Sequence, residues 1–117
     1  MRLTARSTLM VLAGIAALTL IGGAYWPGLD GPFLFDDFSN LTILGAHGRI
    51  DNWPAFLYYI TSGVADPTGR PVALLTFLLD ANTWPSAPWP FKRTNLMLHL
   101  LNTALLAVTV ARLGITE

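Results

Sequence analysis

An uncharged apolar stretch near the start of the chain limits its possible folds more than any other feature. Residues 9–26 read LMVLAGIAALTLIGGAYW and hold no charged side chain. At 1.5 Å per residue, a helix of this length crosses most of the ~30 Å hydrocarbon core of a bilayer. Arg2 and Arg6 precede the stretch, and an aromatic pair ends it, as expected at a headgroup boundary. We therefore predict a transmembrane helix over residues 9–26, with residues 1–8 in the cytoplasm.

A cleaved signal peptide is the alternative interpretation of this stretch. A basic start followed by an apolar segment is also typical of signal peptides, and cleavage would give a secreted product. The apolar part is longer than usual, however, and no clear A-x-A-like site follows it. We therefore favour an uncleaved membrane span.

A second apolar stretch, residues 91–113, reads FKRTNLMLHLLNTALLAVTVARL. Lys92 and Arg93 stand at its outer end and Arg112 at its inner end, where each can reach headgroups. The outer pair weakens the positive-inside argument, unless those cations meet an anionic ligand. Only 12% of the whole chain is charged, against roughly 25% in average soluble domains. We predict a second transmembrane helix here, with residues 114–117 in the cytoplasm.

The intervening loop, residues 27–90, contains two more helical patterns. Residues 52–63 carry an apolar helix face, with Asp51 or Asn52 as cap and a proline in the first turn; the face comprises Trp53, Phe56, Leu57 and Ile60. Residues 71–82 begin with proline, are apolar nearly all round and are too short to span. The prolines and tryptophans that follow predict an irregular interfacial loop.

The predicted fold is therefore an all-α membrane protein. Two transmembrane helices are joined by an outer loop with two juxtamembrane amphipathic helices. We expect the loop in the periplasm and the chain in a bacterial inner membrane.

The charge balance and the absence of cysteine exclude several kinds of site. Seven basic and seven acidic residues give zero net charge, and no basic run indicates a nucleic-acid partner. Without cysteine, neither a disulfide nor a thiolate metal site is possible.

Two adjacent carboxylates, Asp36 and Asp37, follow the first span by about ten residues. Adjacent side chains point in different directions, so one can reach a substrate while the scaffold holds the other. A positioned carboxylate can accept a proton from a hydroxyl. The alternative is a solvated turn or a helix cap. Three nearby aromatic side chains are expected to anchor this segment at the membrane interface: Phe33, Phe35 and Phe38.

Arg70 directly precedes the second short helix of the loop. A guanidinium at such a position suits phosphate binding. Pairing with Asp66 or Asp80, or simple contact with headgroups, is the structural alternative.

The second span also carries a polar stripe, because Lys92, Asn95, His99 and Asn102 recur at helical spacing. Polar groups facing lipid are costly, so this face should meet other helices or a wet cavity. Hydrogen bonding between helices is the simpler interpretation. A lone histidine in the span gives no metal site by itself.

Three segments in order resemble a known family: FLFDDFSN, GRPVALLTFLLD and PWPFKRTNLMLHLLN. They look like the start of polytopic C-type glycosyltransferases, specifically bacterial relatives of the transmembrane and tetratricopeptide repeat-containing O-mannosyltransferases. The resemblance covers residues 33–102. It implies transfer of a sugar from a polyprenyl-phosphate donor to an acceptor hydroxyl on the outer face of the membrane.

The resemblance also implies roles for individual residues. Asp36 or Asp37 would be the general base. Four side chains would serve the lipid-phosphate side of the site: Arg70, Lys92, Arg93 and His99. No cofactor is required by these residues, although the Asp pair leaves a divalent metal open.

Family members have many more spans than the two predicted here. We therefore expect the chain to need further transmembrane helices, of the same or another chain, and to be inactive alone. Its expected partners are membrane lipid, a polyprenyl-phosphate-linked sugar and those helices. The competing hypothesis is a non-catalytic two-span subunit or interaction protein.

Overall fold

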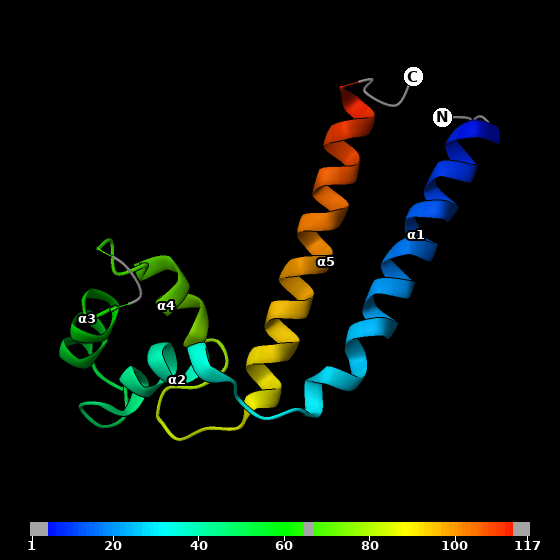
Figure 1. Ribbon diagram of the computed structural model, residues 1–117. Coiled ribbons are helices and arrows are strands. Elements are labelled where there is room, and N and C mark those ends of the chain that lie inside the picture. The colour runs from blue at the N-terminus through cyan, green and yellow to red at the C-terminus, as the bar shows by residue number, and fades with distance from the viewer. Residues whose placement is uncertain (1–4, 65–66, 114–117) are drawn as a thin grey trace. The chain divides into compact units, whose positions relative to one another are not determined.

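The computed structural model describes residues 5–64 and 67–113, and these are arranged in helices joined by loops and turns, without a strand (Figure 1). The chain divides into two compact units, with boundaries between Leu29 and Asp30 and between Phe91 and Lys92. We call the part between these boundaries the middle unit and the remainder the two-helix unit. The predicted cytoplasmic end, residues 114–117, and the first half of the other, residues 1–4, lie outside the described residues.

The two-helix unit is built from α1 (Ala5–Tyr25) and α5 (Pro88–Arg112), with the short 3₁₀ helix η1 (Trp26–Asp30) following α1. The last residue of η1 and the first four residues of α5 fall within the middle unit. The two long helices run antiparallel (Figure 1). Both are long and apolar enough to cross a membrane. The sequence thus placed both helices correctly, although α1 begins four residues before the predicted span.

The first turn of α5 contains residues for which irregular structure was predicted. Pro88 and Pro90 were expected in irregular structure, yet α5 begins at Pro88. The first N–H groups of a helix have no intrahelical partner, so proline loses nothing there and its fixed φ suits the helix. The irregular segment predicted before the second span therefore ends before Pro88.

The middle unit holds three short α-helices and the 3₁₀ helix η2 (Thr42–Gly45); the α-helices are α2 (Phe35–Leu41), α3 (Trp53–Thr61) and α4 (Pro71–Phe77). Two of them fall within the predicted ranges 52–63 and 71–82, and α4 ends five residues early. The cap of α3 is Asn52, whose Oδ1 accepts a hydrogen bond from the N–H of Ala55 at 3.0 Å. The sequence did not predict α2.

The core of the middle unit lies where α3 packs against α4. The buried side chains are Leu41, Leu44, Tyr59, Leu74 and Phe91. Tyr59 donates its hydroxyl to the carbonyl oxygen of Leu74 at 2.9 Å, which ties the two helices together. Burial raises the pKa of this phenol above its ordinary value.

The face of α3 that enters the core contains Tyr59, which is 1% exposed. Trp53 and Leu57, which belong to the apolar face predicted for the membrane surface, are 66% and 41% exposed. Because α3 is apolar nearly all round, hydrophobicity alone does not select a face. When Tyr59 packs on α4, its hydroxyl finds a hydrogen-bond acceptor in the carbonyl oxygen of Leu74. A buried tyrosine hydroxyl usually needs such a partner, which favours burial of this face.

An aromatic cluster lies beside this core. The ring of Phe33 lies 5.1 Å from that of Trp84 and 5.8 Å from that of Phe91, and Phe38 contacts Trp84 at 6.1 Å. Of the three phenylalanines expected at the membrane interface, Phe33 is therefore partly buried in the unit. Phe38 and Phe35 are 51% and 93% exposed and remain available for that role.

Candidate functional site

The two adjacent carboxylates occupy the first turn of α2 and differ in their surroundings. Asp37 Oδ2 accepts a hydrogen bond from the N–H of Leu34 at 2.8 Å, while the N–H of Asp37 bonds the carbonyl oxygen of Leu34 at 2.9 Å. This reciprocal pair is half of a capping box, since the leucine side chain has no acceptor to complete it. The Asp37 carboxylate thus helps to start the helix.

Asp36 is exposed, and its carboxylate forms no hydrogen bond or ion pair with any described residue. Its backbone carbonyl accepts a hydrogen bond from Asn40 Nδ2 at 2.8 Å. Residues four apart lie on the same helix face, so Asp36 stands one turn above Asn40. Of the two carboxylates, Asp36 is the one available to a ligand.

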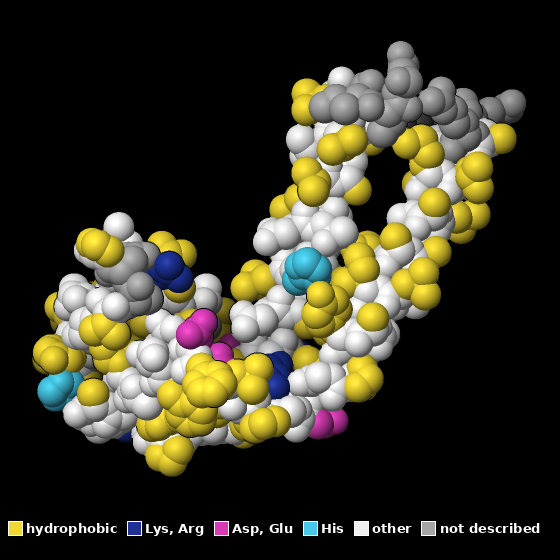
Figure 2. All heavy atoms as spheres, in the orientation of Figure 1, with side chains coloured by type: hydrophobic (Ala, Val, Ile, Leu, Met, Phe, Trp, Pro, Cys, Tyr) yellow, Lys and Arg dark blue, Asp and Glu magenta, His cyan; other side chains and the backbone are white. Residues whose placement is uncertain are grey.

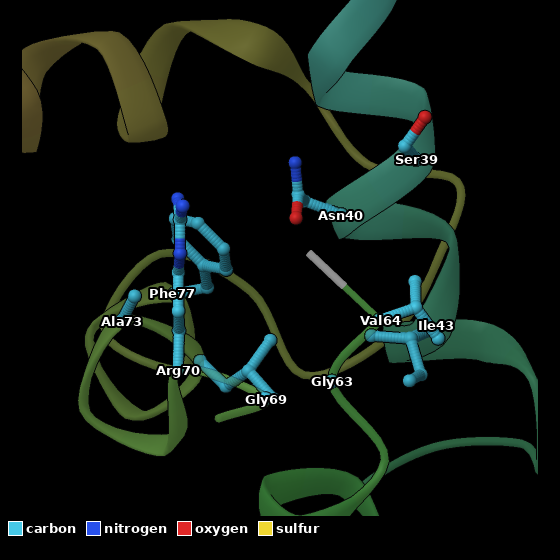
Figure 3. Close-up of a pocket in the computed structure, with 10 residues that line it drawn as sticks. Ser39, Asn40, Ile43, Gly63, Val64, Gly69, Arg70, Ala73 and Phe77 are labelled. Atoms are coloured by element: carbon cyan, nitrogen blue, oxygen red, sulfur yellow. The ribbon is translucent and has the colours of Figure 1, made fainter. Parts of the chain in front are cut away.

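Asn40 points into a small pocket of about 100 Å³ within the middle unit (Figure 3). The opposite wall comes from α4 and the residue before it, with Arg70, Ala73 and Phe77. The hydroxyl of Ser39 points away from this space in the same view. The Asn40 amide donates to the Asp36 carbonyl, so its Oδ1 is left to accept a hydrogen bond from a ligand.

Arg70 has an unusual backbone conformation. Its φ of 46° and ψ of 54° place it in the left-handed region, directly before α4. This region costs a non-glycine residue on the order of 1–2 kcal/mol, so glycine or asparagine would fit the turn better. The carbonyl oxygen of Arg70 nevertheless accepts the first α4 bond, from the N–H of Leu74 at 3.1 Å. A strained arginine at a pocket suggests that its side chain has a role.

A close backbone approach fixes the turn that carries Arg70. A Cβ added to Gly63 would lie 1.8 Å from the carbonyl oxygen of Gly69, a distance that no side chain tolerates. Gly69 itself has a φ of 68°. Both glycines line the pocket, so the two chain segments meet at its edge.

A second pocket, of about 330 Å³, lies within the two-helix unit. Its polar lining comes from both sides: Tyr25 at the end of α1 and Gly28 in η1, and Lys92, Asn95 and His99 on α5. Lys92 Nζ donates to the carbonyl oxygen of Gly28 at 3.2 Å, and the rings of Tyr25 and His99 lie 5.8 Å apart.

The structure thus groups the predicted site residues in two places. Asp36, Asp37 and Arg70 belong to the middle unit, and of these three only Arg70 lines the pocket. Lys92 and His99 line the pocket of the two-helix unit, whereas Arg93, although exposed, does not. The possible partner Asp66 of Arg70 lies outside the described residues.

Sequence reasoning missed Asn40 and Tyr25 as pocket residues. Asn40 was considered only as a turn former, and the four-residue spacing from Asp36 would have identified it had α2 been predicted. Tyr25 was assigned to a headgroup boundary. In the part of the chain that the structure describes, no three His, Asp or Glu side chains are grouped as metal ligands.

Comparisons with protein-family models, with curated proteins and with solved structures gave no match.

Proposed function

We propose that the chain is the N-terminal portion of a membrane glycosyltransferase that moves a sugar from a polyprenyl-phosphate donor to an acceptor hydroxyl. The observation that carries this proposal is the difference in hydrogen bonding between the two adjacent carboxylates of α2. Asp37 is engaged by the backbone of Leu34, whereas the Asp36 carboxylate is exposed, one helical turn from Asn40, which lines the same pocket as Arg70. The motif resemblance suggests the reaction, and this difference between the two carboxylates supports Asp36 as the base.

The chemistry assigned to these residues is a displacement at the anomeric carbon of the sugar. Asp36 accepts the proton of the acceptor hydroxyl while the oxygen of that hydroxyl forms the new glycosidic bond. The bond from the anomeric carbon to the phosphate oxygen breaks, and negative charge remains on the phosphate. A guanidinium such as Arg70 stabilises that charge by paired hydrogen bonds. We assign Lys92, Arg93 and His99 to the lipid-phosphate side, on the motif resemblance.

The decisive experiment compares Asp36→Asn with Asp37→Asn in the complete membrane assembly, with sugar transfer and thermal stability as readouts. We expect Asp36→Asn to reduce transfer by roughly 10²–10⁴-fold, the usual contribution of a general base, with little change in stability. Asp37→Asn should mainly lower stability, because it weakens the cap of α2. If both variants keep wild-type transfer, the proposal is wrong.

A non-catalytic two-span subunit is the second candidate, and the exposure of the long helices favours it. Leu9 and Leu20 of α1 are 68% and 74% exposed, and Leu106 of α5 is 64% exposed. Such faces suit partner helices as well as lipid. Under this alternative, Asn102→Ala disrupts co-purification with a partner helix, while Asp36→Asn has no effect on any function of the complex.

A further inference from the structure

The two-helix unit contains two hollows in line between α1 and α5, one polar and one apolar. The polar one is the 330 Å³ pocket lined by Tyr25, Lys92, Asn95 and His99. The apolar one, about 390 Å³, lies further along the same two helices, between residues 10–18 and 103–111. In the space-filling view a gap separates the two long helices towards the start of α1 and the end of α5 (Figure 2).

The helices approach each other between the two hollows. A Cβ at Gly22 would lie 4.0 Å from Leu100 Cδ1, which is ordinary van der Waals contact. Small side chains then widen the space beyond this contact, notably Gly14, Ala104 and Ala107. The apolar hollow therefore has room for a chain of methylene groups along the helix pair.

The polar hollow is cationic and has unused hydrogen-bonding groups. The Lys92 ammonium has three N–H donors, of which one bonds the carbonyl oxygen of Gly28 and two remain for a ligand. The side chains of Asn95 and His99 form no hydrogen bond with the described residues, and Tyr25 contributes a phenol. Among the residues that the structure describes, no acidic side chain lines this hollow. Its charge and donors thus suit an anion, and a phosphate accepts several such bonds at once.

We propose that this helix pair binds a membrane lipid with a phosphate headgroup. The phosphate lies at Lys92, Asn95 and His99, and one hydrocarbon chain lies in the apolar hollow between α1 and α5. A single amphiphile accounts for both hollows, because its charged and apolar parts follow one another as the polar and apolar hollows do along the helix pair. This proposal rests on the proposed function at one point only. The polyprenyl-phosphate sugar donor proposed above is itself a lipid with a phosphate headgroup.

The test measures lipid retained by the purified full chain in detergent, by native mass spectrometry. The probes are dioleoyl phosphatidic acid and dioleoylglycerol, which share their chains and differ in the phosphate. We expect Lys92→Gln to lower retention of phosphatidic acid roughly tenfold, equivalent to about 1.4 kcal/mol, and to leave dioleoylglycerol unchanged. Ala107→Phe, which fills the apolar hollow, should lower retention of both lipids.

Two further variants separate this site from other causes. Arg112→Gln removes a cation at the opposite end of α5 and should leave retention unchanged. Asn95→Ala removes a side-chain donor that forms no hydrogen bond with the described residues, and it should lower retention of phosphatidic acid. Because no protein hydrogen bond is broken, that lower retention would not be explained by misfolding. An equal effect of Lys92→Gln and Arg112→Gln would overturn the proposal, because general charge attraction would then explain binding.

Competition with inorganic phosphate distinguishes a lipid site from a free-phosphate site. Millimolar phosphate should not displace phosphatidic acid, and ready displacement would contradict the role of the apolar hollow. Asp36→Asn should retain the lipid normally, since Asp36 lies in the other unit. Normal retention together with unchanged sugar transfer would therefore reject the proposed function and keep the lipid site.

Discussion

At the scale of single residues, the middle unit depends on a polar contact inside an apolar core. Tyr59 is almost fully buried, and its hydroxyl is the donor to the carbonyl oxygen of Leu74. Leu74 lies one turn after Arg70, whose carbonyl oxygen holds the Leu74 N–H. The phenol thus positions the start of α4, and with it the guanidinium proposed for the phosphate.

Tyr59→Phe should destabilise the middle unit by about 1–3 kcal/mol, because it leaves the Leu74 carbonyl oxygen without its partner. Denaturant unfolding followed by tryptophan fluorescence measures this loss. Tyr58→Phe is a matched control, since Tyr58 is 51% exposed on the same helix and should cost little. Equal stabilities of the Tyr59 and Tyr58 variants would show that the buried bond contributes nothing.

The raised pKa of Tyr59 predicts a dependence of stability on pH. The unfolded phenol ionises near its ordinary pKa of 10.0, whereas the folded one keeps its proton to higher pH. The folded state therefore binds more protons above pH 10, and stability falls as the pH rises through this range. The stability that burial of the neutral phenol contributes is fully present below pH 10.

Comparison of wild type with Tyr59→Phe between pH 8 and pH 11.5 isolates this term, because the other titrating groups are common to both. Wild type should lose stability faster than the variant above pH 10, by at most about 1.4 kcal/mol per pH unit. Parallel curves would mean that Tyr59 ionises alike in both states.

At the scale of elements, the pocket at Arg70 requires the approach of Gly63 to Gly69. Any side chain at position 63 meets backbone, so the turn has to open and α4 has to shift. Gly63→Ala should therefore lower stability by roughly 1–3 kcal/mol and reduce sugar transfer with it. Gly23→Ala, at a helical position with nothing within 4 Å, should do neither, and thermal unfolding of both variants measures the difference.

The elements also show what could be predicted from the sequence. The long helices follow from length and lack of charge, and the Asn52 cap from its residue type. In contrast, α2 starts with a bond between Asp37 and the Leu34 backbone, and the sequence FDDFSN reads equally well as a turn. The buried face of α3 also required knowledge of α4, because nearly every face of α3 is apolar.

The candidate site was predictable in its residues but not in their roles. The Asp pair offered two equivalent carboxylates, and only the contact from Leu34 distinguishes Asp37 from Asp36. The left-handed backbone of Arg70 follows from the Gly69 turn and the start of α4, which no local pattern specifies. Both distinctions depend on hydrogen bonds and backbone geometry that residue types alone do not determine.

At the scale of the whole molecule, the two long helices join the middle unit at both of its ends. Because α1 and α5 run antiparallel, Ala5 and Arg112 belong to the same end of the pair, and residues 30–91 follow the opposite end (Figure 1). If both helices cross the membrane, the chain between them emerges on the side opposite to Ala5 and Arg112. With the predicted cytoplasmic N-terminus, Asp36 is then expected on the outer face.

Single-cysteine labelling of intact cells tests that arrangement, and the chain has no native cysteine to interfere. A membrane-impermeant maleimide should label Ser39→Cys, an exposed position on α2, without permeabilisation. Ala5→Cys and Arg112→Cys, also exposed, should react only after the membrane is opened. Labelling of Ala5→Cys from outside would reverse the orientation. Loss of the Ala5→Cys signal with release of the remaining chain would instead support a cleaved signal peptide, since cleavage removes α1 and its lipid-binding face together.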